Sequence, residues 1–447
     1  MRFWIFPVFA MSVVCFSACD SSEILQRPAN VNKNQPKPPE KQAHSAVPNP
    51  AAKQRKRHNL EAAAALEKLG GKISYNAAKS VVRVDLSYST VDDADLVHLK
   101  QFLDLERLNL SETAVTESGL KHLKGLTKLR VLRLKRAAND AGLAHLKELP
   151  NLQVLDLFQT EITDAGLKQV AQMKKLKELD ISRTNRVGDE GIALLKNLTT
   201  LRNLKIQETR EVTNACVKHL KALTDLERLG LSGQNFSNSS LEQLAALTKL
   251  KSLELDHTII TDAGLEYLKG MQNLEVLHCR YTQIGGAGLT HLKGLTRMKR
   301  LMFRDTLIGN AGLANLKGMS ELETLELSET LVGDDGLQHL SQLTKLSRLL
   351  LWRTKTTSAG LVQLRKLTNL RLLNLEETEV DDEGLKHLSK LTKLETLNLR
   401  KTRITDTGLK HLQSLVKLKQ LSLGFTNVTD DGVQALQEAL LSCEVNR

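Results

Sequence analysis

The stretch LETLNLRKTRITDTGLKHLQSL, from Leu394 to Leu415, decides how this chain folds. Leu397 and Leu399 are two residues apart, so both side chains point to one face of a short strand. From Leu409 onward the leucines recur every third residue, which is typical of one face of a short helix or 3-10 turn. Ordering one such unit costs more free energy than its few buried aliphatic side chains return. The unit therefore predicts neighbours of the same kind.

The link between the two halves also carries structural signals. Thr402 and Ile404 are expected to turn the chain inward. Thr405 and Asp406 come next, where side-chain oxygens can accept hydrogen bonds from the first amide groups of the helix. Gly408 follows at a position where the backbones of neighbouring units can approach closely. We therefore expect Thr405 and Asp406 to cap the helix of their own unit.

The same unit recurs along most of the chain. Its second apolar strand position occurs 15 times, at intervals of 23 to 25 residues. These positions are Leu86, Leu110, Leu134, Leu157, Ile181, Ile206, Leu231, Leu255, Cys279, Phe303, Leu327, Leu351, Leu375, Leu399 and Leu423. A period in this range is typical of a solenoid, in which each unit buries its apolar face against the next.

The repeated pattern, LxxLxLxxTxI followed by TDxGL, resembles the leucine-rich repeat family. Within that family it is similar to the TDxGL class found in ribonuclease-inhibitor-like and F-box-type repeats. The resemblance covers residues 82–447 and implies an α/β fold. The expected architecture is a right-handed solenoid of about 15 repeats of 24 residues, with a parallel concave β-sheet and short convex helices. No segment resembles an F-box, so a role in ubiquitin ligation is not implied.

Threonine replaces the family's usual asparagine at the ladder position of the repeat. Examples are Thr113, Thr160, Thr258, Thr330 and Thr402. A threonine hydroxyl both donates and accepts, so we expect it to bridge backbone groups of adjacent turns.

Residues 1–19, MRFWIFPVFAMSVVCFSAC, are predicted to be a signal peptide of the lipoprotein type. Arg2 precedes an apolar run of about 16 residues, which is short for a membrane span but suits a secretory signal. The run ends in FSAC, which resembles a bacterial lipobox, although Phe16 stands where leucine is usual. The resemblance implies lipidation of Cys19 and a membrane-anchored protein of the cell envelope. Simple secretion, a periplasmic location or an uncleaved anchor are the alternatives.

The rest of the chain divides into three segments. Residues 20–58 are rich in proline and lysine and lack an apolar period, so they are predicted to be a disordered linker. Residues 59–81 are predicted to form a capping helix and strand, and residues 82–447 the repeats. Cys443 and Val445 repeat the inward strand spacing, which predicts a truncated sixteenth strand as the C-terminal cap.

Composition and motifs disfavour several classes of function. The net charge of +12 includes a local +5 from the linker, and no basic and aromatic stripe accompanies it, so nucleic acid is not an expected partner. The chain has no nucleophile elbow, P-loop, HExxH motif or dinucleotide-binding motif, so we expect neither catalysis nor a cofactor. Histidines at one repeated helical position would lie about 8–10 Å apart, too far to share a metal ion. Cys216 takes the glycine position of its helix and Cys279 an inward strand position, so both are predicted to be buried thiols.

One zone of the predicted concave surface differs from the rest. Many outward strand positions carry serine, asparagine or glutamate, but between residues 254 and 353 they include aromatic and arginine side chains. Aromatic and arginine residues dominate the binding energy of protein interfaces, and here they lie on strands about 4.8 Å apart. The candidate binding residues are Glu254, Asp256, His257, His278, Arg280, Tyr281, Arg304, Asp305, Glu326, Trp352 and Arg353. Sequence drift on a tolerant surface is the alternative interpretation, and Asp256 with Arg280 can be a simple ion pair.

Some repeats are irregular. One lacks a residue near Ala137 and Ala138, and the two that follow Ile181 and Ile206 each gain one, around Arg186 and Arg210. Insertions in a solenoid map to one edge, where they serve as binding loops or simply reflect relaxed local packing.

These features predict a non-enzymatic scaffold or adaptor, exported and lipid-anchored, that recognises a macromolecule, most readily a protein, on its concave face. The alternative is a structural component of the cell envelope that contacts acidic wall polymer or glycan through basic surfaces.

Overall fold

The computed structural model describes residues 50–447, and these form one compact unit. The predicted signal peptide 1–19, the lipidation site Cys19 and the linker as far as residue 49 lie outside the described residues. Within residues 50–447, no helix is long and apolar enough to cross a membrane.

One sheet of 17 strands runs through the whole unit. Strands β2 to β17 pair in parallel in chain order, and β1 pairs antiparallel with β2. The strands are β1 Lys72–Tyr75, β2 Val81–Asp85, β3 Arg107–Asn109, β4 Val131–Arg133, β5 Val154–Asp156, β6 Glu178–Asp180, β7 Asn203–Lys205, β8 Arg228–Gly230, β9 Ser252–Glu254, β10 Val276–His278, β11 Arg300–Met302, β12 Thr324–Glu326, β13 Arg348–Leu350, β14 Leu372–Asn374, β15 Thr396–Asn398, β16 Gln420–Ser422 and β17 Glu444–Asn446.

A short α-helix, a 3-10 segment or both follow each strand from β2 to β16. The α-helices are α1 Pro50–Lys68, α2 Glu117–Leu120, α3 Asp140–Ala144, α4 Asp164–Val170, α5 Asp189–Leu194, α6 Asn214–Leu220, α7 Asn238–Leu244, α8 Asp262–Leu265, α9 Asp334–Leu337, α10 Ser358–Leu361, α11 Asp382–Leu385, α12 Asp406–Leu409 and α13 Asp430–Ala439. The 3-10 segments are η1 Asp95–Gln101, η2 Lys121–Leu123, η3 His145–Glu148, η4 Leu195–Asn197, η5 Glu266–Leu268, η6 Gly288–Leu292, η7 Asn310–Leu316, η8 Gln338–Leu340, η9 Val362–Lys366, η10 Lys386–Leu388 and η11 Lys410–Leu412.

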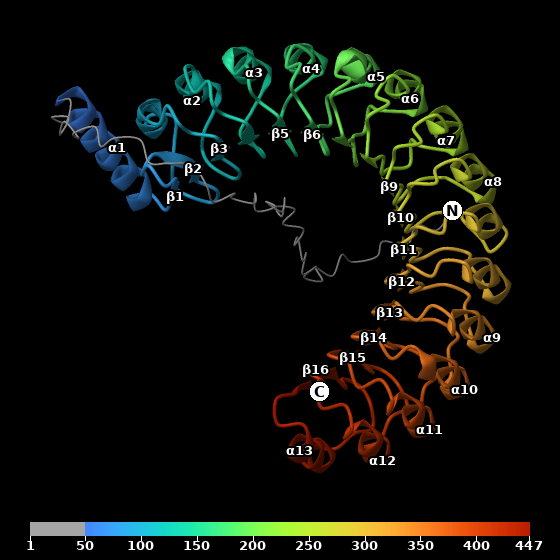
Figure 1. The fold of residues 1–447 in the computed structure, drawn as a ribbon. Helices are drawn as coiled ribbons and strands as arrows, with labels where there is room; N and C mark the ends of the chain where they lie inside the picture. The colour runs from blue at the N-terminus through green and yellow to red at the C-terminus, as the bar shows by residue number, and fades with distance from the viewer. Residues whose placement is uncertain (1–49) are drawn as a thin grey trace, which may run out of the picture. The chain divides into compact units, whose positions relative to one another are not determined.

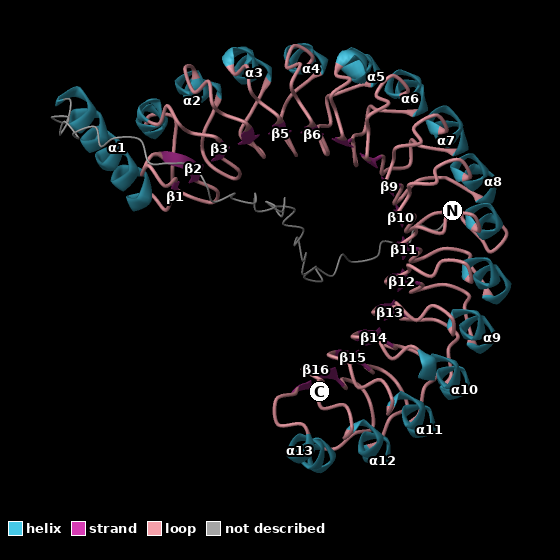
Figure 2. Cartoon of the chain, in the orientation of Figure 1, coloured by secondary structure: helices cyan, strands magenta, loops and turns pink. Residues whose placement is uncertain are grey.

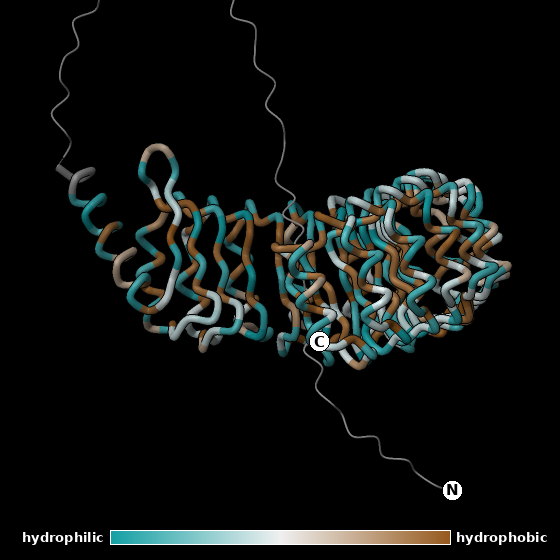
Figure 3. Tube along the Cα trace, turned by 90° about the horizontal axis from the view of Figure 1, so that it is seen from below, coloured by the Kyte–Doolittle hydropathy of each residue, from teal (hydrophilic) through white to brown (hydrophobic). Residues whose placement is uncertain are grey.

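The unit is a solenoid, as predicted. Each repeat forms one coil, which consists of a strand and the helical segment that follows it. Figure 1 shows the coils following one another along an arc, and Figure 2 shows the strands on the inner side and the helices on the outer side. Leucines of successive strands are in register, as in the pairing of Leu397 with Leu421, and both are fully buried. Leu399, Leu409 and Leu412 of the same coil join them in one continuous core. Apolar segments recur from coil to coil when the chain is coloured by hydropathy (Figure 3). The period of two in the strand and three in the helix therefore encodes this stacking.

The N-terminal cap begins earlier than predicted. The first helix starts at Pro50 and not at Asn59, so residues 50–58 of the predicted linker are helical. Proline suits the first position of a helix because its missing amide proton would have no partner there. The alanines, glutamine and basic residues that follow are good helix formers. Ala62, Ala63 and Leu66 of this helix are buried in the core, which closes the first coil.

At the other end, β17 pairs with β16, and Cys443 just before it is buried. The predicted sixteenth strand is therefore present. Cys216 and Cys279 are also buried, as predicted, and all three thiols are free.

The threonine ladder works differently from the prediction. The hydroxyls of Thr113, Thr160, Thr258, Thr330 and Thr402 each donate to a carbonyl three residues earlier, at 2.5–2.7 Å. Each bond closes the turn after the strand of its own coil. These threonines therefore shape single coils and do not bridge adjacent ones.

Aspartate at the start of the helix provides the link between coils. Thr405 caps its own helix, as expected, by accepting from the Thr407 amide at 3.2 Å. Asp406 does not, because its carboxylate accepts from the backbone amide and hydroxyl of Thr429, one coil later, at 2.8 and 2.7 Å. These bonds hold the pKa of Asp406 below its usual value. Asp93, Asp140, Asp189, Asp334 and Asp382 make the same pair of bonds.

The glycine of TDxGL makes room for this aspartate. A Cβ atom on Gly408 would overlap the carboxylate of Asp382 from the preceding coil and would lie 3.2 Å from the Asp382 Cα atom. Glycine at this position is therefore a requirement of the close approach between coils, as the sequence suggested.

A test of the aspartate link compares two neighbouring carboxylates. Asp334 accepts from the amide and hydroxyl of Thr357 at 2.8 and 2.6 Å, whereas Asp335 makes no hydrogen bond to another described residue. We expect Asp334→Ala to lower the free energy of unfolding by about 1–3 kcal/mol, because a half-buried amide loses its partner. Asp335→Ala, which removes the same charge, should change it by less than about 0.5 kcal/mol. Urea denaturation followed by circular dichroism measures both, and equal effects would show that the link contributes nothing.

Candidate functional site

The candidate zone lies on the concave side of strands β9 to β13. Each strand buries its central leucine, such as Leu253 or Leu301, and turns the flanking residues away from the core. Strand register places Glu254, His278, Met302, Glu326 and Leu350 in one row across the five strands. All the predicted site residues therefore occupy the coils that the sequence assigned to them.

Two further rows follow the second buried position of each strand. The first holds Asp256, Arg280, Arg304, Ser328 and Trp352. The second holds His257, Tyr281, Asp305, Glu329 and Arg353, all with φ between 51° and 61°. This left-handed conformation is unfavourable for residues other than glycine. It bends the chain out of the strand and presents these five side chains at the rim of the concave surface.

Five side chains of the zone form one aromatic and cationic cluster. The rings of His257 and Tyr281 stack with centroids 4.3 Å apart and an interplanar angle of 8°. The Arg304 guanidinium lies 5.4 Å from the Tyr281 centroid and 4.5 Å from the Trp352 centroid. Arg353 lies 5.7 Å from the Trp352 ring. Cation–π contacts of this kind restrain flexible arginine side chains.

Trp352 is less open than the sequence predicted. Its side chain is half-buried, and its Nε1 atom is covered without a hydrogen-bond partner among residues 50–447. The reason is packing by neighbouring coils, since Arg304 reaches across from two coils earlier.

Glu329 and Glu377 anchor the two arginines, and the sequence reasoning missed both. Arg304 Nε donates to Glu329 at 2.9 Å, and Arg353 bonds Glu329 at 2.8 Å and Glu377 at 3.1 Å. Both glutamates occupy the same left-handed row as Arg353, one coil before and after it. That shared repeat position was the signal that could have identified them.

A second group of charges is satisfied internally. Arg280 contacts Asp256 at 3.3 Å and, across the strand of Met302, Glu326 at 2.7 Å. Glu326 is only 7% exposed. Asp256 and Arg280 thus form the ion pair that the sequence allowed for, and Glu326 completes it.

His278 is close to the charges of this second group. Burial lowers its pKa, and the nearby carboxylates of Glu254 and Asp256 oppose this shift without reversing it. No group of three metal-ligating side chains occurs in the part of the chain that the structure describes.

An exposed apolar row borders the zone, and the sequence reasoning missed it. Ile259, Leu307 and Leu331 follow the ladder threonine and are 48%, 61% and 51% exposed. The other coils place small, polar or charged residues there, such as Ala114, Gln283 or Arg403. The three residues extend the aromatic cluster with an apolar border in the same coils.

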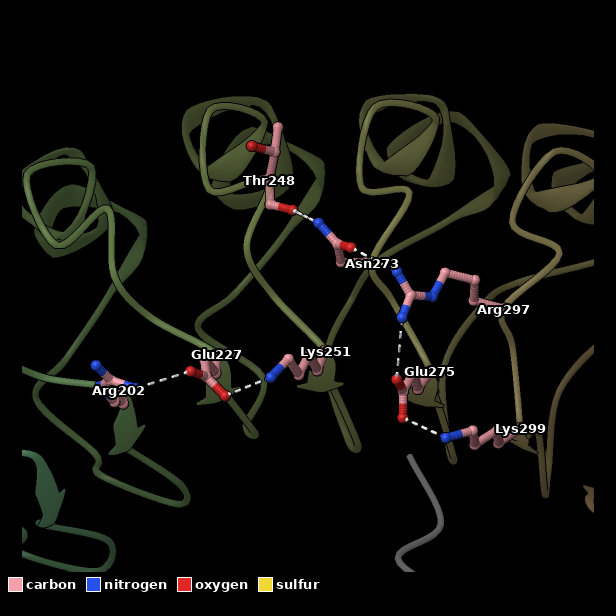
Figure 4. Close-up of polar contacts among 8 residues, drawn as sticks. All are labelled: Arg202, Glu227, Thr248, Lys251, Asn273, Glu275, Arg297 and Lys299. Carbon is pink, nitrogen blue, oxygen red and sulfur yellow. Dashed lines mark hydrogen bonds and ion pairs between the residues drawn. The ribbon is translucent and has the colours of Figure 1, made fainter.

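Just before the strands begin, along the edge of the sheet formed by their N-terminal ends, basic residues are paired with acidic residues from adjacent coils (Figure 4). Glu227 contacts Arg202 at 3.3 Å and Lys251 at 2.8 Å, and Glu275 contacts Lys299 at 2.9 Å. Lys251 lowers the pKa of Glu227 through its hydrogen bond. These basic side chains are therefore balanced locally.

Comparison with known sequences identifies the repeats in two parts of the chain. A family described as "Leucine-rich repeat region" matches residues 86–261. A second, "Leucine Rich repeat", matches residues 366–389, 390–412 and 414–436. Together they cover more than half of the chain. No curated protein matches the sequence.

Among similar solved structures, one supports the fold, and two others are less similar. A leucine-rich repeat protein of Leptospira interrogans is 20% identical with a TM-score of 0.58, over 84% of this chain and all of that one. An internalin of Listeria monocytogenes is 19% identical with a TM-score of 0.44, over 87% of this chain and 93% of that one. The ectodomain of the Arabidopsis receptor kinase HAESA, solved with a peptide hormone, is 15% identical with a TM-score of 0.48, over 84% and 82% of the two chains.

The environment of His278 leads to a prediction about pH. Because its folded-state pKa is lowered, the unfolded chain binds more protons than the folded chain just below the ordinary histidine pKa of about 6.5. The contribution of His278 to stability is therefore complete above about pH 6.5 and is lost as the pH falls below it. We expect the imidazole to titrate below about 6.5 in an NMR experiment, with the signal assigned by its absence in His278→Gln. A midpoint above that value would mean that the carboxylates outweigh burial.

Proposed function

Because the chain belongs to the leucine-rich repeat family, we propose that it is a non-enzymatic scaffold that binds a protein partner through the concave surface of β9 to β13. The supporting observation is the cluster of His257, Tyr281, Arg304, Trp352 and Arg353, which joins three aromatic rings to two arginines. Tryptophan, tyrosine and arginine are the residues that most often dominate the binding energy of interfaces.

The contacts that hold the two arginines of the cluster favour binding. Arg304 and Arg353 are held by Glu329 and by aromatic rings, so less side-chain entropy is lost when a partner docks. The adjacent apolar border of Ile259, Leu307 and Leu331 offers surface that a partner can remove from water. Aromatic, apolar and charged groups side by side suit a folded protein surface better than a simple polyanion.

The alternative function, contact with an acidic envelope polymer, depends on unbalanced positive charge. Within residues 50–447 many basic side chains are paired with carboxylates one coil away, as Lys251 is with Glu227 (Figure 4). This pairing favours the protein-binding function. The two functions also differ in their response to salt, since scattered surface charges are screened at moderate ionic strength.

We also propose that the chain is exported and anchored to a membrane through lipidated Cys19. The support comes from the sequence, in which Ser17, Ala18 and Cys19 match the lipobox. The proline-rich residues that follow would let the repeat unit stand away from the membrane surface.

The binding surface is tested by removing the centre of the cluster. The full chain is immobilised and used to capture proteins from an envelope extract of the source cells. Hot-spot residues contribute about 2 kcal/mol or more each. We therefore expect Trp352→Ala with Arg304→Ala to reduce capture of a specific partner more than tenfold. Capture by the wild type should persist at roughly 0.3 M salt, where the screening length is about 6 Å.

The matched control is Arg400→Ala with Phe425→Ala. That pair has the same cation–π geometry, 4.8 Å from guanidinium to ring, but lies outside the zone. It should leave capture unchanged. Capture that survives the zone variant, or that disappears at moderate salt in the wild type, would contradict the proposed surface.

The membrane anchor is tested separately. Cys19→Ser should abolish incorporation of a labelled fatty acid and release the protein from the membrane fraction, because serine lacks the thiol that carries the lipid. Cys443→Ser, which alters a thiol far from the signal, should retain the label. A label that persists in Cys19→Ser would exclude this lipidation site.

A further inference from the structure

A second candidate site lies outside the concave zone, in the turns that follow β5, β6, β7 and β8. A cavity of about 430 Å³ opens there. Its volume falls within the range of about 300–1,000 Å³ found for small-molecule sites. The polar part of its wall includes Arg183, Asn185, Glu208, Arg210, Ser232 and Asn235.

The two irregular repeats create this cavity. Each gains one residue, and Asn185 and Arg210 from those lengthened turns both line it. In the next coil Gly233 occupies the left-handed row, where the other coils have a side chain. Extra backbone on one side and a missing side chain on the other leave the space open.

The lengthened turns leave backbone amides without their usual partners. In most coils the residue after the ladder threonine donates from its amide to a carbonyl of the preceding coil, as Ile259 does to Phe236 at 3.0 Å. The amides of Asn185 and Arg210, at the same position, make no such bond within residues 50–447. In the next coil the side chain of Asn235, and not its amide, bonds two carbonyls of the preceding coil, at 2.7 and 3.1 Å. Three lining residues therefore have unused backbone donors.

The side chains of the wall add further donors and a net charge. The Arg210 guanidinium makes no hydrogen bond or ion pair with another described residue. Ser232 is only 6% exposed, and its hydroxyl also has no partner in the described part of the chain. Glu208, in contrast, is already paired, because it accepts from Arg183 at 2.8 Å. The charged lining residues are two arginines and one glutamate, so one positive charge remains unbalanced, at Arg210.

Unused donors and one unbalanced positive charge suit a ligand that accepts hydrogen bonds and carries one negative charge. A carboxylate meets both requirements, because its two oxygens can accept two parallel hydrogen bonds from a guanidinium. A phosphate dianion would place excess negative charge near Glu208, and an ammonium group would meet the unpaired Arg210.

We propose that this cavity binds a carboxylate group at Arg210, carried by a small organic acid or by an acidic side chain of a peptide. The unpaired amides and the Ser232 hydroxyl supply the remaining hydrogen bonds. None of the lining residues belongs to the concave zone, so the site stands or falls independently of the protein-binding surface.

The test uses the purified full chain and two matched pairs of probes. Each pair compares a carboxylate with its neutral amide: lactate with lactamide, and the end-blocked tripeptide Ala-Glu-Ala with Ala-Gln-Ala. Saturation-transfer NMR detects binding, and titration gives the dissociation constant. We expect at least one carboxylate to bind about tenfold more tightly than its amide, or better. Binding of lactate supports a small acid as the source of the carboxylate, and binding of the peptide alone supports an acidic side chain.

Two variants of the wall should act in opposite directions. Arg210→Gln should weaken carboxylate binding about tenfold or more, because it removes the charge and the paired donors. Glu208→Gln should strengthen binding severalfold, because it removes a negative charge near the ligand and releases Arg183. A purely structural role of Glu208 would have the reverse effect. All three side chains are exposed, and circular dichroism checks that each variant folds.

The matched control is Arg186→Gln. Arg186 follows Asn185 in the lengthened turn, is exposed and has no ion pair within residues 50–447, but it does not line the cavity. It should leave binding unchanged. The proposal is overturned if neither carboxylate binds more tightly than its amide or if Arg210→Gln behaves like Arg186→Gln. Tighter binding of inorganic phosphate than of either carboxylate would also overturn it.

Discussion

Stacking of leucines between successive coils is the constraint on which this structure depends. A single coil has a strand of about three residues and one or two helical turns, which is too little to bury its own side chains. Leu397 becomes fully buried only because Leu373 and Leu421 lie beside it in register. Every coil is therefore stabilised by its neighbours, and the two ends need α1 and β17 to cover them.

The same constraint leaves other positions free for recognition. Stacking uses the inward residues of each strand and helix, and it requires little of the residues between them. In most coils those residues are small or polar, but in β9 to β13 they form the cluster around Trp352. In the coils of β5 to β8 it is the turn that varies, and a cavity results. A tolerant scaffold can thus carry two distinct surfaces without any change in its core.

Several features could not be predicted from one repeat considered alone. Asp406 looked like a helix cap because it stands at a helix start, but its partner Thr429 lies 23 residues later. Thr402 looked like a bridge between coils, yet its hydroxyl reaches a carbonyl within its own turn. Trp352 was expected to be exposed, but the guanidinium of Arg304, two coils earlier, lies over its ring. In each case the decisive partner depends on how the backbone brings one coil against another.

The sequence by itself determined the solenoid, its strand positions, its buried spine and the coils that carry unusual outward residues. It could do so because a period of two in a strand, or of three in a short helix, places the apolar side chains on one face of that element. This holds whatever the position of the element in the fold. The tertiary structure decided which of those outward residues touch. Arg280 pairs with Glu326 across an intervening strand, and Gly233 leaves a cavity beside the lengthened turns. Such contacts depend on side-chain reach and coil curvature, which a linear pattern does not encode.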